Sequence, residues 1–125
     1  SLGLVPEFAS SYMLQANIGA QQAAELFYTA EWINAERAVS VGIAARAYAD
    51  DELLAAAMEK AAEIAQWPVS SLKEIKATLR LPHRAHIDAA LLAEDEAMAR
   101  QAGSPENIEA VVAFMEKRKP DFSQF

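Results

Sequence analysis

The chain has 125 residues and a formal net charge of −7 at pH 7, with no cysteine and only four glycines. This length is one domain's worth of chain, enough for a modest core. The acidic balance argues against general binding to nucleic acid or to anionic membranes. The absence of cysteine excludes a disulfide framework and a thiolate metal site, and it is compatible with a reducing cytosol, so we predict a cytoplasmic protein. No apolar run approaches the roughly 20 residues of a membrane span.

Short helices are predicted in the first half of the chain. Two of them are expected at about residues 10–17 and 20–29, and Asn34 is expected to cap a third that reaches Val41. Residues 43–48 are predicted to form a short strand or an extended turn. The two tryptophans, Trp32 and Trp67, are predicted to lie in the core or in an interface rather than to bind a ligand.

Longer helices are predicted in the second half, at about residues 50–65, 71–81, 86–102 and 106–119. Asp50 is expected to cap the first of these helices, Ser71 with Glu74 has the spacing of a capping box, and Pro82 is expected to end the second. Ser104 before a proline is a typical N-cap. The apolar spacing predicts buried stripes formed by Ile87, Leu91 and Met98 and by Ile108, Val111, Val112 and Met115. The acidic run Glu94-Asp95-Glu96 is predicted to be a solvated helix face.

The segment from Leu2 to Tyr12, LGLVPEFASSY, places an acid directly after a proline and just before a helix. Glu7 is therefore expected near a helix N-terminus, whose free amides stabilise negative charge. Apolar neighbours such as Phe8 would desolvate the same carboxylate and oppose that effect. A glutamate between these influences could act as a general base. The alternative is an ordinary acid at a helix start. Ser10 and Ser11 are predicted to cap or pack, because no base lies nearby to activate a hydroxyl.

Two residues near the end of the chain form a second candidate site. Phe114 and Lys117 are expected to share a helix face with Ala110, away from the predicted buried stripe. A flat ring beside an ammonium could bind an adenine and a phosphate. The alternative is an edge contact plus a solvated cation. His83 and His86 lie three residues apart, but a metal site would need more ligands, so no metal is predicted.

These motifs together resemble the enoyl-CoA hydratase/isomerase (crotonase) superfamily. LGLVPEFASSY is similar to a central motif of that family, and AFMEKRKPDF at residues 113–122 is the most specific match. The resemblance covers essentially the whole chain but only the C-terminal half of the family's length, so we expect a fragment. It implies a mainly α fold, the C-terminal helical half of a ββα spiral, with about six helices and at most short strands. Residues 1–66 would be the tail end of the spiral core, and residues 67–125 a helical oligomerisation subdomain.

The resemblance also implies a function. Glutamate directly after the motif's proline, here Glu7, is similar to the Δ3,Δ2-enoyl-CoA isomerases, in which it moves a proton between C2 and C4. The substrate would be an acyl-CoA thioester that carries coenzyme A itself, with no permanently bound cofactor. Phe114 and Lys117 match positions that reach the adenosine and phosphate end of CoA, often in a neighbouring subunit's site. The full-length parent is expected to be a homo-oligomer, a trimer or hexamer.

Two alternatives to the isomerase remain. Hydratases of the family use two glutamates, both upstream of this motif, so hydratase chemistry stays open. The isolated fragment could also be an inactive helical oligomerisation module, because the family's first half supplies the oxyanion hole.

Overall fold

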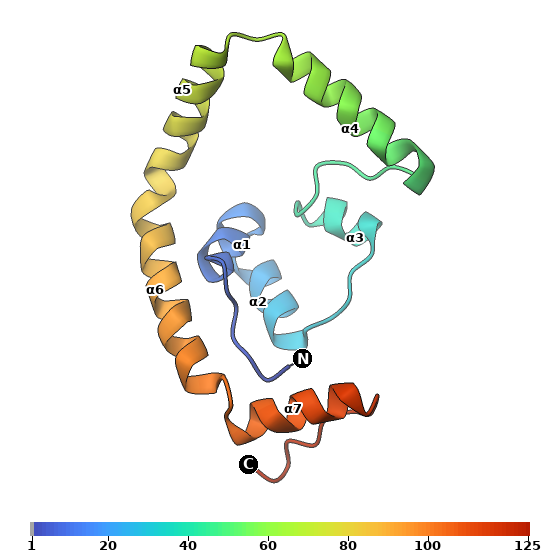
Figure 1. Cartoon of the computed structure of the whole chain (residues 1–125), viewed down its shortest axis with the longest axis vertical. Coiled ribbons are helices and arrows are strands. Elements are labelled where there is room, and N and C mark those ends of the chain that lie inside the picture. The colour runs from blue at the N-terminus through green and yellow to red at the C-terminus, as the bar shows by residue number, and fades with distance from the viewer. Residues whose placement is uncertain (1) are drawn as a thin grey trace. The chain divides into compact units, whose positions relative to one another are not determined.

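The computed structural model describes residues 2–125, and within this range helices are the only regular secondary structure (Figure 1). Within this range the elements are α1 Ser10–Ile18, α2 Ala20–Thr29, α3 Ala35–Ser40, α4 Asp50–Ala65, α5 Val69–Arg80, the 3₁₀ helix η1 Leu81–His83, α6 Arg84–Gln101 and α7 Pro105–Met115. The prediction of a mainly helical fold is confirmed. Residues 43–48 are bends and irregular backbone, so the predicted strand does not form.

Two predicted N-caps form as expected. The Asn34 side chain accepts a hydrogen bond from the Arg37 N–H at 2.8 Å. The Ser104 hydroxyl oxygen accepts one from the Asn107 N–H at 3.1 Å. Each side chain satisfies an amide that has no partner within its own helix, which is why the short α3 and the proline-led α7 begin where they do.

In the middle of the chain the predicted capping roles of Ser71 and Asp50 are wrong, whereas the helix end expected at Pro82 is confirmed. Pro68 directly precedes α5, so that helix begins at Val69 and Ser71 lies inside it rather than capping it. Helix α5 ends at Arg80, just before Pro82 as predicted, and Pro82 lies in η1, which leads directly into α6. Proline has a fixed φ and needs no amide partner, so it favours the first turn of a helix. Asp50 is the first residue of α4 and makes no cap hydrogen bond.

The last helix is shorter than predicted, since α7 ends at Met115. Lys117 has φ +55°, and its N–H donates to the Phe114 carbonyl at 3.2 Å. The Arg118 N–H donates to the Ala113 carbonyl at 2.9 Å. This pair of bonds around a left-handed residue is the Schellman arrangement that closes helix C-termini. Lys117 therefore lies beyond the helix, and the predicted helical face shared by Ala110, Phe114 and Lys117 is wrong.

The described residues group into two compact units. The first unit contains the chain up to Glu31 together with His86–Phe125, and the second contains Trp32–Ala85. All the buried residues of the described chain belong to the first unit: Ala9, Ala23, Glu94, Ala110 and Ala113. The second unit, within the described range, buries no residue to that extent. The predicted division into residues 1–66 and 67–125 separated a spiral core from an oligomerisation subdomain. The two compact units do not test that functional division, so it stays a prediction.

Burial within α7 is the reverse of the predicted pattern. Ala113 has 0% of its surface exposed and Ala110 1%, whereas the predicted stripe, Ile108, Val111, Val112 and Met115, is exposed. Helical spacing locates an apolar stripe, but it does not reveal whether the same chain covers that stripe. The tryptophans follow the same rule: Trp32 and Trp67 are both exposed, so neither is a core residue of this chain.

No helix in the described part of the chain is both long and apolar enough to cross a membrane.

Candidate functional site around Glu7

Glu7 begins a tight turn that leads into α1. The Ser10 N–H donates to the Glu7 carbonyl at 3.1 Å, which closes a four-residue turn that we call the Glu7 turn, residues 7–10. Its two central residues, Phe8 and Ala9, have φ values of +66° and +58°. Positive φ at both central positions is the pattern of a type I′ turn, which normally uses glycine, asparagine or aspartate.

The Glu7 carboxylate is exposed, and among residues 2–125 it makes no hydrogen bond or ion pair. Phe8 is 93% exposed, so it does not desolvate Glu7, and the crowding expected from this neighbour is absent. A carboxylate with all its lone pairs available can take up a proton from a substrate. The geometry thus leaves Glu7 chemically available at a defined point of the backbone.

The amides at the start of α1 bind another carboxylate, that of Glu94 in α6. The Ala9 N–H donates to Glu94 Oε2 at 2.6 Å, and the Ser11 N–H donates to Glu94 Oε1 at 2.8 Å. The charge at this helix N-terminus therefore belongs to Glu94 and not to Glu7, which corrects the expected role of the free amides. Ala9 is the N-cap residue and has no side chain with which to cap, so Glu94 supplies the missing acceptor.

Glu94 is 6% exposed, so the prediction that it belongs to a solvated face is wrong, although Asp95 and Glu96 are exposed as predicted. Burial acts to raise the pKa of Glu94, but hydrogen bonds from Ser11 and Ala9 outweigh burial and set that pKa below its ordinary value. Glu94 is therefore ionised at neutral pH. Charge-assisted hydrogen bonds of this kind are among the stronger ones in proteins.

A signal for Glu94 was present in the sequence. The predicted inward residues Ile87, Leu91 and Met98 continue at helical spacing through position 94, so Glu94 lies on the apolar stripe of its own helix. An ionised residue on such a stripe is rarely left unpaired. Its partners could not be identified from sequence, because they are backbone amides about 85 positions earlier.

The segment before the Glu7 turn is fixed at a second point by α7. The Asn107 side-chain amide donates to the Leu2 carbonyl at 2.8 Å, and its carbonyl oxygen accepts the Gly103 N–H at 2.9 Å. Gly3 has φ +65° and lies close to the start of α7, where an added Cβ would be 3.1 Å from the Glu106 carbonyl oxygen. Both ends of the segment that carries Glu7 are thus bonded to the C-terminal helices.

An aromatic contact joins the same elements. The rings of Tyr12 and His86 stack with centroids 5.0 Å apart and planes inclined by 23°. This contact gives His86 a packing role. Among the described residues, no three His, Cys, Asp or Glu side chains are grouped so that they could hold a metal ion.

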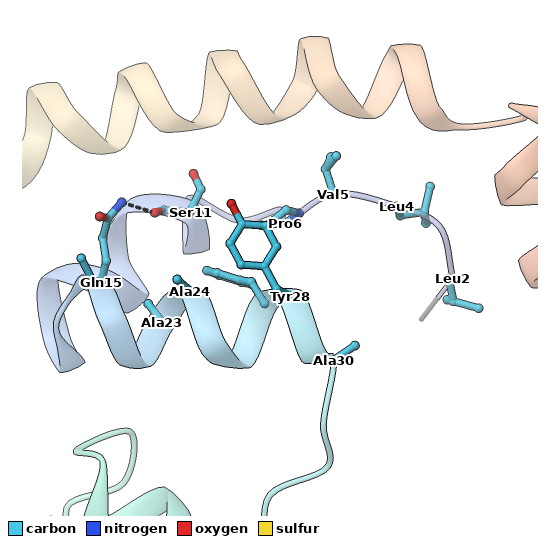
Figure 2. Close-up of a pocket in the computed structure, with 12 residues that line it drawn as sticks. Leu2, Leu4, Val5, Pro6, Ser11, Gln15, Ala23, Ala24, Tyr28 and Ala30 are labelled. Carbon is cyan, nitrogen blue, oxygen red and sulfur yellow. Dashed lines mark hydrogen bonds between the residues drawn. The ribbon is translucent and has the colours of Figure 1, made fainter. Parts of the chain in front are cut away.

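An open groove of about 620 Å³ lies beside the Glu7 turn, between residues 2–6 and helices α1 and α2 (Figure 2). Figure 2 shows the Tyr28 ring pointing from α2 toward Pro6, with Leu2 and Leu4 further along the N-terminal segment. The lining is mostly apolar and consists of Leu2, Leu4, Val5, Pro6, Ser11, Gln15, Ala20, Ala23, Ala24, Phe27, Tyr28 and Ala30. Pro6 and Ser11 flank Glu7 in the sequence and line the groove, whereas Glu7 itself does not.

The second candidate pair, Phe114 and Lys117, lies at the end of α7. Both side chains are exposed, and in the described chain neither is bonded to Glu7. Arg118, expected to add positive charge here, instead forms ion pairs with Glu109 at 2.5 Å and with Glu116 at 2.7 Å. Hydrogen bonds from Arg118 and from the Asp121 amide lower the pKa of Glu109 to about 2. The positive charge left for a phosphate is therefore that of Lys117 and Lys119.

Comparison with known proteins identifies the family to which this chain belongs. The chain matches the enoyl-CoA hydratase/isomerase family over residues 1–125, and it belongs to that family. It is 30% identical over 118 residues to a short-chain-enoyl-CoA hydratase of Clostridium acetobutylicum, covering 94% of this chain and 45% of the relative. It is also 30% identical over 121 residues to a crotonyl-CoA hydratase of Syntrophomonas wolfei, covering 97% of this chain and 46% of the relative.

A solved structure shows the same fold. The crystal structure of an enoyl-CoA hydratase/isomerase from Pseudoalteromonas atlantica T6c matches with a TM-score of 0.90 and 34% identity, over 98% of this chain and 49% of that one. The crotonase-like fold is therefore confirmed. The chain spans about half the length of the relatives it matches.

Proposed function

We propose that this chain is the C-terminal half of an acyl-CoA enzyme that isomerises enoyl-CoA, with Glu7 as the proton shuttle. The observation that carries this proposal is the Glu7 carboxylate, exposed and unbonded within the described chain, on a fixed turn beside an apolar groove. Family membership supports the acyl-CoA thioester as substrate. Coenzyme A would arrive and leave with that substrate, and no permanently bound cofactor is proposed.

One carboxylate is enough for this reaction. Glu7 would remove a proton from C2 of a 3-enoyl thioester while the electron pair of that C–H bond forms the C1–C2 double bond of a dienolate and the carbonyl π electrons move onto the thioester oxygen. It would then return the proton to C4, so that the double bond moves from C3–C4 to C2–C3 and no atom is gained or lost. Negative charge on the thioester oxygen would be stabilised by hydrogen-bond donors supplied from outside this chain.

Hydratase activity is the second candidate, and the names of the relatives favour it, since the Clostridium and Syntrophomonas proteins are both hydratases by name. Hydration must activate and place a water molecule as well as protonate carbon, which is why a second acid helps. Under this alternative the main catalytic acids lie outside the chain, and Glu7 has a secondary role in the substrate pocket.

The experiment that separates these candidates uses the full-length protein that contains this chain, as wild type and as Glu7→Gln. Isomerisation of a 3-enoyl-CoA and hydration of a 2-enoyl-CoA are followed in the same preparations. We expect Glu7→Gln to reduce isomerisation by about 10³-fold, as for loss of a general base. The control is Glu96→Gln, which makes the same change at an exposed position in α6. Hydration that dominates and survives Glu7→Gln would overturn the isomerase proposal.

Phe114 and Lys117 are proposed to contact the adenosine and phosphate end of CoA, in this subunit or a neighbouring one. Lys117→Gly is a sharp test, because glycine suits the +55° φ at this position while the ammonium is removed. We expect KM for acyl-CoA to rise about tenfold with little change in kcat, consistent with a lost charge-assisted contact. Lys117→Arg keeps the charge and should keep KM. An unchanged KM in Lys117→Gly would remove Lys117 from the site.

We further propose that the parent protein is a cytoplasmic homo-oligomer, a trimer or hexamer. The support is the number of large apolar side chains that the described chain leaves exposed, among them Leu54, Met58 and Met115. The isolated chain would be an inactive helical oligomerisation module, because the oxyanion hole is supplied from outside it. Turnover of a 3-enoyl-CoA by the isolated chain would contradict that part of the proposal.

A further inference from the structure

The Glu7 turn has a backbone conformation that its own residues do not favour. Phe8 and Ala9 are consecutive non-glycine residues with positive φ, at +66° and +58°. A side chain with a Cβ rarely adopts this region, and two such residues in succession need support from outside the turn. Neither residue can provide that support itself, because Phe8 is exposed and Ala9 has only a methyl group.

The hydrogen bonds of the turn show where the support comes from. The Ser10 N–H donates to the Glu7 carbonyl, and the Tyr12 and Met13 N–H groups both donate to the Ala9 carbonyl, so these amides are satisfied locally. The other two amides of this stretch, those of Ala9 and Ser11, donate to the two oxygens of Glu94. Glu94 is thus the one side chain from a distant element that these five amides use within the described chain.

The two bonds to Glu94 constrain the turn in a specific way. They leave the backbone on either side of Ser10 and run to the two oxygens of one planar carboxylate, at 2.6 Å and 2.8 Å. This bidentate geometry fixes both the position and the direction of the peptide plane that joins Phe8 to Ala9. Glu7 lies one residue before that plane. Any change in the φ of Phe8 would therefore redirect the Glu7 side chain.

We infer that Glu94 is a positioning residue: it stabilises the left-handed Phe8–Ala9 backbone and so aims the Glu7 carboxylate at the substrate. The inference rests on the proposed role of Glu7 as proton shuttle. Glu94 itself is buried and accepts hydrogen bonds from the backbone, so it does not touch the reacting atoms.

The test compares Glu94→Gln with wild type in the full-length protein that contains this chain. Glutamine keeps the size of the side chain but presents an NH₂ group to one of the two backbone donors, so one hydrogen bond is lost and the other loses its charge. We expect exchange of the Ala9 and Ser11 amide hydrogens to accelerate about tenfold or more. We expect kcat for isomerisation to fall about tenfold to a hundredfold, as for a misplaced catalytic group, with KM changed less than about threefold.

Glu96→Gln is the matched control and should change neither quantity, because Glu96 is exposed two residues further along α6. Glu94→Asp is the milder variant if Glu94→Gln folds poorly, since it keeps the charge but withdraws the carboxylate by one methylene. Its kcat should lie between those of wild type and Glu94→Gln. A purely structural role would lower the amount of folded protein and leave the kcat of the folded fraction unchanged.

The inference and the proposed function fail in distinguishable ways. Faster exchange at Ala9 and Ser11 with an unchanged kcat would overturn the positioning role and leave Glu7 as shuttle. If the wild type shows no turnover, the proposed function fails, and the φ-dependent NMR couplings of Phe8 and Ala9 decide the inference. Couplings that stay the same in Glu94→Gln would overturn it, and couplings that move toward negative φ would support it.

Discussion

The Glu7 turn and helix α4 show two different ways in which a segment of this chain is stabilised. The turn is exposed at Phe8, yet its backbone is bonded to Glu94 of α6, and the segment before it is bonded to Asn107 of α7. Helix α4 is regular for 16 residues, but it has no buried residue, and its large apolar side chains, such as Leu54 at 73% exposure, face outward. Local sequence is enough to make α4 a helix, whereas the turn depends on distant residues.

This difference predicts which substitutions should lower the free energy of unfolding most. Tertiary hydrogen bonds from a few polar residues define the geometry of the candidate site, and their loss cannot be compensated locally. Exposed apolar residues of α4 contribute to the stability of this chain only through helix propensity. Four measurements of unfolding by urea test this comparison.

The largest effect is expected for Glu94→Ala. This change leaves the Ala9 and Ser11 amides without their acceptor, so the free energy of unfolding should fall by about 3 kcal/mol. The control, Glu96→Ala at an exposed position, should change it by less than about 0.5 kcal/mol. Equal effects of the two substitutions would mean that Glu94 is no more important than a surface acid.

A smaller loss, about 2 kcal/mol, is expected for Gly3→Ala, because the new Cβ meets both a positive φ and a nearby backbone. The added carbon would be 3.1 Å from the Glu106 carbonyl oxygen. Gly19→Ala separates the two causes, since Gly19 has φ +87° but open space around it. We expect about half the loss there. If Gly19→Ala is as harmful as Gly3→Ala, the contact with α7 adds nothing.

Acid pH provides the third test. Burial acts to raise the pKa of Glu94, but the hydrogen bonds from Ser11 and Ala9 outweigh it and lower that pKa. Hydrogen bonds from Arg118 and from the Asp121 amide lower the pKa of Glu109 to about 2. A lowered carboxyl pKa contributes stability above its unfolded value and loses that contribution as pH falls through the folded value. The free energy of unfolding should therefore decrease from about pH 5 down to pH 2. Glu109→Gln should flatten the lowest part of that decrease, and a stability that does not change with acid pH would contradict both assignments.

The smallest effect is expected for Leu54→Ala in α4, less than about 0.5 kcal/mol, because both residues favour helix and the side chain is exposed. In an assembled full-length protein the same substitution should cost more, since another surface would then cover Leu54. Comparing the free energy of unfolding lost in the isolated chain with that lost in the full-length protein tests whether another surface covers α4. A loss above about 2 kcal/mol in the isolated chain would show that α4 already packs against something within it.

Much of the helical fold was predictable from sequence, because caps and apolar spacing act locally. Asn34 and Ser104 mark helix starts that the structure confirms. The burial pattern of α7 was not predictable, because its alanines are covered while its large residues are exposed. That outcome depends on which surfaces meet, and this information is not local.

The candidate site was predictable in one part only. The motif around Glu7 indicated an acid before a helix, and the structure places Glu7 there. The acceptor for the amides of that helix came from a run of three acids, two of which are exposed as expected. Only the position of Glu94 on an apolar stripe distinguished it, and its partners are backbone groups that carry no sequence signature.

The separation of 85 positions between Ala9 and Glu94 also bears on when the site can form. A ribosome releases the Glu7 segment long before it releases α6, and closing so long a loop has an entropic cost that local contacts do not repay. α1 and α2 can become helical early, but the left-handed turn has to wait for Glu94. The Glu7 turn should therefore be among the last parts of this chain to reach its final conformation during synthesis.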